Sequence, residues 1–221
     1  MKRLPLLLVA VLALTACGGK KQAAPLGTTN ATTTVDAQGC HSIKTPDPEK
    51  RHVPKPTLTL DPKKTYDVTL QTNCGDITIR LDVKDSPKTT ASFVYLVRRQ
   101  FFVDTVFHRI IPNFVIQGGD PTGTGTEGPG YETVEAPPKS TKYTDGVVAM
   151  AKAQNEAAGT AGSQFFIVIG SDAATLTPDY ALLGKVTKGL DVAKTIGTFG
   201  DPNTGSITRL IEIEKATVDV S

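Results

Sequence analysis

The feature that most constrains the fold of this chain is residues 107–120, Phe-His-Arg-Ile-Ile-Pro-Asn-Phe-Val-Ile-Gln-Gly-Gly-Asp. Two short apolar runs flank a proline, and a glycine pair follows the second run. Alternation places Arg109 on one face of the first run, and Val115 with Gln117 on one face of the second. Because proline cannot donate to a central ladder, Pro112-Asn113 is expected to form the corner between two paired strands. The segment predicts a hairpin with one arginine beside an apolar surface; an ordinary buried hairpin whose arginine reaches solvent is the alternative.

Period-two alternation elsewhere in the chain predicts a fold built mainly of short strands. Residues 66–72 and 76–82 alternate around the turn Asn73-Cys74-Gly75, which is typical of a hairpin. Ser86-Pro87 has the form of a helix start, with apolar residues following at helical spacing. Further strands are expected at residues 105–111, 114–118, 147–150, 165–169, 182–186 and 207–218, and a short helix at 190–196. Many short strands with one early and one late helix indicate an all-β domain that closes into an antiparallel barrel.

A second apolar segment, residues 162–168, reads Gly-Ser-Gln-Phe-Phe-Ile-Val and is followed after a loop by Leu176. Together with residues 107–120, Met150-Ala151 and residues 182–186, it resembles the cyclophilin family of peptidyl-prolyl isomerases, with the motifs in the family's order. The resemblance covers about residues 64–219. It implies a closed eight-stranded antiparallel barrel capped by two helices, with a solidly packed interior and a ligand groove on the outer surface.

The resemblance also implies a peptidyl-prolyl cis-trans isomerase that needs no metal and no cofactor. Rotation about an amide is opposed by a barrier of about 18 to 20 kcal/mol, and in the twisted state the proline nitrogen regains a lone pair. A fixed cationic donor stabilises that state more than the planar one, and Arg109 is the expected catalytic residue. The expected substrate-binding residues are Phe114, Val115, Phe166 and Leu176 for the proline ring, with Gln117, Ala151, Lys152, Gln164 and Tyr180 around them.

Three positions depart from the best-known eukaryotic pattern of the family. Lys152 stands where asparagine is usual, Tyr180 replaces a histidine, and Thr175 replaces a tryptophan. In relatives that are sensitive to the cyclic peptide cyclosporin, that tryptophan packs on the drug and donates a hydrogen bond to it. His108, inside the main motif, is interpreted as a packed structural histidine and not as an acid or base. We therefore expect catalysis to persist and cyclosporin binding to be weak.

The N-terminus has the form of a bacterial export signal. Met1-Lys2-Arg3 is followed by an apolar run up to Ala16 that is too short to span a bilayer. Residues 14–17, Leu-Thr-Ala-Cys, resemble the lipobox, in which the cysteine is diacylated and becomes the new first residue. We expect a signal peptide over residues 1–16, a lipid on Cys17, and anchoring on the extracytoplasmic side of a bacterial cell membrane. A plain secretory signal cut near Ala16 is the alternative.

Residues 17–56 are polar and rich in proline and threonine, and they lack apolar periodicity. We expect a disordered tether that begins at the lipidated Cys17 and leads to an isomerase domain at residues 57–221. The remaining cysteines, Cys40 and Cys74, form an even pair in a compartment where thiols oxidise. A Cys40–Cys74 disulfide is expected, with two unpaired thiols as the alternative.

Charge argues against nucleic acid as a partner. Removing Lys2 and Arg3 of the signal from the 24 basic residues leaves 22, which balance the 22 acidic ones. Residues 119–125 look superficially like a phosphate-binding loop but lack its lysine and the serine or threonine that follows. The expected partners are proline-containing segments of exported proteins, and the expected state is a monomer. The alternative function is a non-catalytic proline-binding or chaperone module on the same fold.

Overall fold

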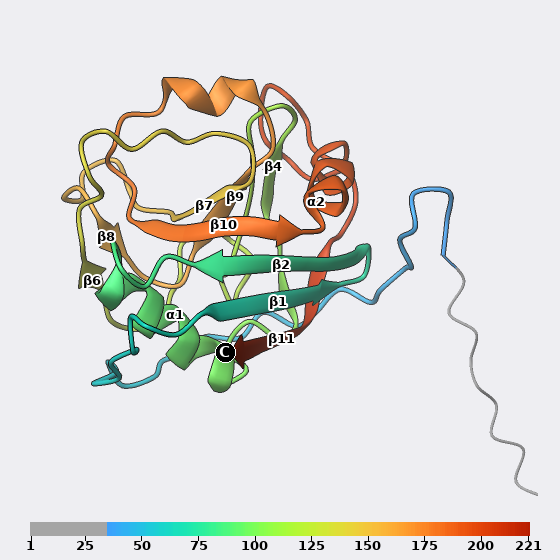
Figure 1. The fold of residues 1–221 in the computed structure, drawn as a ribbon. Helices are drawn as coiled ribbons and strands as arrows, with labels where there is room; N and C mark the ends of the chain where they lie inside the picture. The colour runs from blue at the N-terminus through green and yellow to red at the C-terminus, as the bar shows by residue number, and fades with distance from the viewer. Residues whose placement is uncertain (1–34) are drawn as a thin grey trace, which may run out of the picture. The chain divides into compact units, whose positions relative to one another are not determined.

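The computed structural model describes residues 35–221, and the expected signal peptide and Cys17 lie outside the described residues. This part of the chain is mostly β-structure with two α-helices, as the sequence predicts (Figure 1). The strands are β1 Tyr66–Thr72, β2 Gly75–Leu81, β3 Thr105–Val106, β4 Arg109–Ile111, β5 Val115–Gly118, β6 Thr133–Val134, β7 Val147–Met150, β8 Thr160–Ala161, β9 Phe165–Val168, β10 Leu182–Lys188 and β11 Glu212–Val220. The helices are α1 Pro87–Arg98, the 3-10 helix η1 Ser171–Thr175 and α2 Leu190–Gly197.

Nine of the strands form one strongly curled antiparallel sheet in the order β3-β11-β1-β2-β10-β7-β9-β5-β4. The two end strands, β3 and β4, are consecutive in the chain and are separated only by Phe107 and His108. Counted as one interrupted strand, they give the eight strands that were expected. This interrupted strand pairs with β11 through β3 and with β5 through β4, so the antiparallel sheet curls round on itself as the expected fold class requires.

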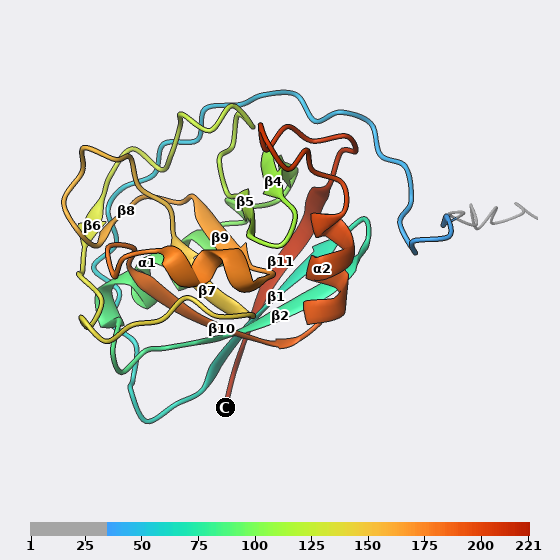
Figure 2. The same ribbon diagram turned by 90° about the horizontal axis from the view of Figure 1, so that it is seen from above.

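Both expected helices are present, and they lie on opposite sides of the curled sheet (Figures 1 and 2). Helix α1 begins at Pro87 directly after Ser86, but the Ser86 side chain makes no capping hydrogen bond. The carboxylate of Glu135 instead accepts hydrogen bonds from the amides of Lys88 at 3.2 Å and Thr89 at 2.9 Å. A distant carboxylate thus satisfies the free N–H groups of the first turn and matches the helix dipole. No helix in residues 35–221 is long and apolar enough to cross a bilayer.

Alternation along the strands divides the apolar residues between the two faces of the sheet. In β9, Phe165 and Ile167 belong to the main core, whereas Phe166 and Val168 belong to a second, smaller cluster. In β5, Ile116 belongs to the core and Val115 to the second cluster. Edge-to-face contacts between aromatic rings fill the core, which is packed as the resemblance implies. The second cluster therefore lies on the outer face.

Apart from shifts of one or two residues at strand ends and the interruption at residues 107 and 108, the structure differs from the expected strands in two places. The last strand begins at Glu212 and not at Ile207, because Ile207 bridges to Gly200 and Thr208 donates its N–H to the carbonyl of Phe199. A small sheet of β6 and β8, which the sequence did not predict, forms apart from the large one. Both strands have only two residues, too few to show an alternating pattern.

Residues 41–56, here called the N-terminal strap, run along the outside of the domain and not as the disordered tether that was expected up to residue 56 (Figure 2). The strap starts beside the expected disulfide between Cys40 and Cys74, which is present. Further along, Arg51 donates to the carbonyls of Phe101 and Val103, at 2.8 and 2.5 Å. The expectation rested on low apolar content, proline and charge, and these features do not reveal which distant residues a segment contacts. An extended, proline-rich segment is held here by a cross-link, an arginine and its own backbone amides.

Candidate active site

The hairpin β4–β5 carries Arg109, the expected catalytic residue, at its open end, away from the turn. The two strands are joined by a four-residue turn from Ile111 to Phe114, in which the Phe114 N–H donates to the Ile111 carbonyl at 3.1 Å. Proline in the second position, followed by Asn113 with a φ of 59°, is the pattern of a type II turn. The corner predicted at Pro112-Asn113 is therefore confirmed, and it places Phe114 close to the arginine.

A row of side-chain hydrogen bonds extends from Arg109 across the sheet. Its Nη1 donates to Oε1 of Gln117 at 3.4 Å, and Nε2 of Gln117 donates to Oε1 of Gln164 at 3.1 Å. Nε2 of Gln164 in turn donates to the backbone carbonyl of Glu127 at 3.1 Å. Each amide orients the next group in the row. The other N–H groups of the guanidinium make no hydrogen bond to residues 35–221 and remain available as donors.

An apolar surface lies beside the arginine and is formed by the second cluster. Val115 and Phe166 are its floor, with 2% and 4% of their surface exposed, while Phe114 and Leu176 are half-buried at its sides. The Arg109 Cζ atom lies 6.0 Å from the centroid of the Phe114 ring. The structure thus brings together the four residues that the sequence analysis assigned to a proline pocket, and it puts a cation at their edge.

Tyr143 was not predicted, yet it supports this surface from below. Its buried hydroxyl donates to the carbonyl of Tyr180 at 2.7 Å and accepts from the Tyr180 N–H at 3.0 Å. Burial raises the pKa of Tyr143 to about 12, so the hydroxyl stays protonated at neutral pH. The Tyr180 ring packs edge-on against Phe166, with the centroids 5.4 Å apart. No local sequence pattern connects residues 143 and 180, which is why Tyr143 was missed.

Ala151 and Lys152 follow β7 and border the same groove. The Ala151 N–H donates to the Gln164 carbonyl at 2.9 Å and is therefore not free for a peptide ligand. The Lys152 Nζ donates to the carbonyls of Ala153 and Glu156, at 3.2 and 3.0 Å, and lies 5.8 Å from the Tyr180 ring centroid. The lysine thus holds its own loop together. A peptide that aligns here would use the remaining backbone groups of residues 151 and 152.

Asp120, to which the sequence analysis gave no role, organises the loop that leads away from the site. Its buried carboxylate accepts from the amides of Thr122, Thr126 and Glu127, at 2.7, 2.8 and 3.2 Å. Burial alone would raise the pKa of Asp120, but these hydrogen bonds outweigh it and the pKa is lowered. The Asp-Pro-Thr-Gly sequence was a usable signal, because aspartate often accepts from the backbone two residues ahead.

His108 lies near this loop, and burial lowers the pKa of its ring despite the nearby charge of Asp120. The imidazole is therefore neutral at physiological pH. That state suits the structural role expected for His108 better than proton transfer. Within residues 35–221, no three His, Cys, Asp or Glu side chains are placed to hold a metal ion.

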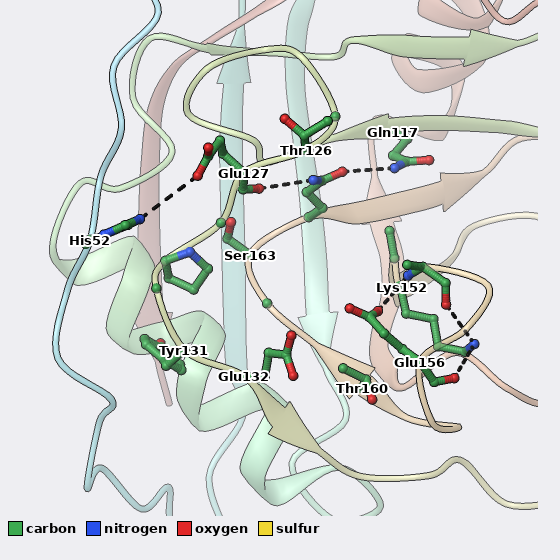
Figure 3. Close-up of a pocket in the computed structure, with 18 residues that line it drawn as sticks. His52, Gln117, Thr126, Glu127, Tyr131, Glu132, Lys152, Glu156, Thr160 and Ser163 are labelled. Atoms are coloured by element: carbon green, nitrogen blue, oxygen red, sulfur yellow. Dashed lines mark hydrogen bonds and ion pairs between the residues drawn. The ribbon is translucent and has the colours of Figure 1, made fainter.

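A cavity of about 700 Å³ adjoins the groove (Figure 3). Four of the expected site residues line it: Gln117, Ala151, Lys152 and Gln164. The opposite wall comes from the loop with Thr126 and Glu127, and from His52 of the N-terminal strap. Nothing in the sequence pattern of the strap indicated that it borders the site, so this contribution was not predicted.

The comparisons with known proteins agree with this geometry. The sequence model of the family described as cyclophilin type peptidyl-prolyl cis-trans isomerase matches residues 67–218. A peptidyl-prolyl cis-trans isomerase of Arabidopsis thaliana is 35% identical over 156 residues, which are 69% of this chain and 93% of that protein. One of Helicobacter pylori is 37% identical over 151 residues, 62% of this chain and 90% of that protein.

Among solved structures, a cyclophilin type peptidyl-prolyl cis-trans isomerase of Cryptosporidium parvum, crystallised in the presence of the dipeptide Ala-Pro, has a TM-score of 0.63 and 31% sequence identity. The match covers 69% of this chain and 98% of that one. The sequence match and the fold coincide over the segment that carries the arginine and the apolar groove. The chain belongs to the cyclophilin-type peptidyl-prolyl cis-trans isomerases, and its enzymatic activity is the cis-trans isomerisation of peptidyl-prolyl bonds.

Proposed function

We propose that this isomerase acts on proline-containing segments of exported proteins and that Arg109 stabilises the twisted amide during the reaction. The observation that carries the mechanism is the position of the guanidinium, beside the Phe114 ring and hydrogen-bonded to Gln117. It places a permanent cation at the edge of an apolar surface on which a proline ring fits. The substrate-binding roles of the surrounding residues are part of the same proposal.

The chemistry needs a donor that favours the twisted state over the planar one. When the C–N bond rotates, conjugation is lost and the proline nitrogen becomes a hydrogen-bond acceptor. Arg109 then donates to a lone pair that the ground state does not offer. Because the bond exists only in the twisted state, its free energy lowers the barrier and not merely the energy of binding.

Magnitudes show that the arginine does not act alone. A thousandfold acceleration needs about 4 kcal/mol, whereas one hydrogen bond to a charged group supplies about 1.5 to 3 kcal/mol. The apolar floor of Val115 and Phe166 supplies a second contribution, because it excludes water from the amide and removes hydrogen bonds that favour the planar carbonyl. Fixing the peptide along residues 151 and 152 supplies a third.

The cellular setting is inferred from the cysteines and the N-terminus. The Cys40–Cys74 disulfide suits an oxidising, extracytoplasmic compartment. The lipobox-like sequence that ends at Cys17 adds a lipid anchor. Together they support an enzyme held on the outer side of a bacterial cell membrane, where newly exported chains need their X-Pro bonds isomerised; that it acts as a monomer is part of the same proposal.

The test is an NMR exchange measurement on a short Ala-Pro peptide with the wild type and with Arg109→Ala. Acceleration by the wild type and its loss in the variant support the mechanism. Binding of the peptide without acceleration by the wild type would favour the non-catalytic binding module instead. Equal acceleration by both proteins would remove Arg109 from the mechanism.

A further inference from the structure

The N-terminal strap is fixed to the loop of residues 118–130 at three points. The Glu49 N–H donates to the Pro121 carbonyl at 3.3 Å, and the Val53 N–H donates to the Pro129 carbonyl at 2.9 Å. Between them, Lys50 and Glu127 form an ion pair with Nζ and Oε1 2.5 Å apart. The strap therefore contacts this loop near both ends and in the middle, in addition to the hydrogen bonds that Asp120 makes within the loop.

The middle of the loop reaches the candidate active site through the backbone of Glu127. Its carbonyl accepts the hydrogen bond from Gln164, which begins the row to Gln117 and Arg109. Figure 3 shows His52 joined to Glu127, and two successive hydrogen bonds that lead from Glu127 to Gln117. Glu127 thus links the two parts. Its side chain contacts the strap, and its backbone carbonyl accepts from the row of side chains that ends at Arg109.

Arg51 is the residue that secures the strap to the rest of the domain. Only 19% of its side chain is exposed, and both of its backbone acceptors, Phe101 and Val103, follow helix α1. Neither acceptor belongs to the loop or to the groove. Arg51 itself does not line the cavity, so replacing it would loosen the strap without altering a side chain of the site directly.

The strap lies outside the part of the chain that matches the family, residues 67–218. Its contacts are therefore additions of this chain to the family domain. The fixed end at the disulfide, the anchor at Arg51 and the three contacts to the loop form one continuous support.

We propose that residues 49–53 of the strap position Arg109 by holding Glu127, so that the carbonyl of Glu127 keeps Gln164 and Gln117 in the orientation that fixes the guanidinium. Arg51 is accordingly a positioning residue, since it acts through other groups and touches no substrate. The inference rests on the proposed role of Arg109, but the orientation of the row can be measured whether or not that role is correct.

The experiment uses the full chain with Arg51→Ala, Arg51→Lys and Lys55→Ala. Lys55 is an exposed basic residue of the same strap that makes no hydrogen bond or ion pair to residues 35–221, and it serves as the matched control. Hydrogen exchange of the Val53 amide reports whether the strap is released, and thermal melting reports whether the domain is folded. If Arg51→Ala does not release the strap, the double variant Arg51→Ala/Val53→Pro also removes the donor to Pro129, and hydrogen exchange of the Glu49 amide, which donates to Pro121, then reports the release.

Two quantities are then measured in the variant whose strap is released. The side-chain amide signals of Gln117 and Gln164 and the Nε signal of Arg109 should shift in NMR spectra, and kcat on an Ala-Pro peptide should fall by about 2- to 30-fold. KM should change less than kcat, because the apolar floor is untouched. Arg51→Lys should restore part of kcat, and Lys55→Ala should match the wild type.

The outcomes separate the two proposals. Shifted glutamine signals in a released strap support the positioning role, even if the wild type proves inactive and the proposed mechanism is thereby lost. A released strap with unchanged glutamine signals and unchanged kcat overturns the inference, whatever the activity of Arg109 variants. A rise in KM alone, with the row unchanged, also overturns it, because the strap would then only border the cavity.

Discussion

Arg109 and Gln117 lie directly opposite each other in the β4–β5 ladder, and the arginine donates to the glutamine side chain at 3.4 Å. Paired residues in an antiparallel ladder project from the same face of the sheet, so the register itself brings these two side chains together. The glutamine is in turn held by Gln164. The guanidinium is therefore oriented before a substrate arrives, which is the condition for electrostatic catalysis.

Arg109→Ala should lower kcat/KM on an Ala-Pro peptide by about 10- to 200-fold, if the hydrogen bond in the twisted state supplies about 1.5 to 3 kcal/mol. Arg109→Lys keeps the charge but loses the planar fork and the reach to Gln117, so its activity should be intermediate. NMR exchange spectroscopy measures both. A lysine variant as active as the wild type would show that charge alone matters and that the oriented fork does not.

Loss of the Cys40–Cys74 disulfide should destabilise the domain. The bond closes a loop with a sequence separation of 34, and the chain-entropy estimate for such a loop is about 3 to 4 kcal/mol. Both sulfurs are buried, with Cys40 1% and Cys74 7% exposed. Urea unfolding of the wild type should therefore shift to a lower midpoint in the variant Cys40→Ala/Cys74→Ala.

The wild type under reducing conditions is the control for that experiment. It should unfold close to the double variant, because both lack the cross-link. Equal urea midpoints for the oxidised wild type and the double variant would mean that the disulfide only fixes the strap and adds nothing to the stability of the domain.

The sequence predicted the fold well where the pattern was local. Alternation located the strands of the large sheet, and Ser86-Pro87 located the start of α1. Prediction from local patterns failed where pairing depends on distant residues. Ile207 continues the apolar pattern of the last strand, yet it pairs with Gly200. The helix cap comes from Glu135, which lies far along the chain from α1 and which no local rule could indicate.

In the candidate site, too, features on regular strands could be predicted, whereas contacts made through loops could not. Arg109, Gln117 and the apolar floor lie on regular strands, so their common face could be inferred from alternation and from the family motifs. Tyr143 and Glu127 reach the site through loops, and only the folded chain shows that they do. The contacts of the strap were missed because they join residues far apart in the sequence, such as Arg51 with Phe101 and Val103, and low apolar content does not reveal them.

Asp120→Asn should destabilise the protein most at neutral pH. The pKa of Asp120 is lowered in the folded state, since hydrogen bonds to its carboxylate outweigh burial. A lowered pKa means that this stabilisation is complete above the ordinary value of 3.8 and is lost as the pH falls through the folded value. The asparagine amide cannot accept all of these bonds, so at pH 7 the variant should lose about 1 to 3 kcal/mol.

Urea unfolding at pH 7 and at pH values below 3.8 tests this sign, with the exposed Asp85→Asn as the control. The difference between the wild type and Asp120→Asn should shrink in acid, while the control should show little difference at either pH. A gap that stays constant or widens in acid would contradict the charged state of Asp120.

The anchoring proposal is tested at Cys17. Expressed in a bacterium, the wild type should be found in the membrane fraction, with a mass that includes acyl chains on a cysteine at the new N-terminus. Cys17→Ser should be released or remain unprocessed, whereas Cys40→Ala should still be anchored. An unmodified N-terminus beyond residue 17 in the mature wild type would exclude the lipid anchor and favour a plain secretory signal.

Thr175 should make the enzyme a poor target for cyclosporin. The residue ends η1 next to Leu176 of the apolar cluster, and its hydroxyl donates to the Asp172 carbonyl at 2.8 Å. The only donor of its side chain is therefore already used within the helix. Compared with a tryptophan at this position, the drug loses a hydrogen bond of about 0.5 to 1.5 kcal/mol and an aromatic contact of about 1.5 to 3 kcal/mol.

The combined loss should weaken drug binding by about 30- to 2000-fold relative to a relative with the tryptophan. Catalysis should persist, because the pocket that we propose for the proline ring has its floor at Val115 and Phe166 and does not include this rim. Titration of the drug against isomerase activity measures the effect, and Thr175→Trp should recover part of the affinity with kcat unchanged. Tight inhibition of the wild type, or no gain in Thr175→Trp, would show that residue 175 does not occupy the drug-contacting rim.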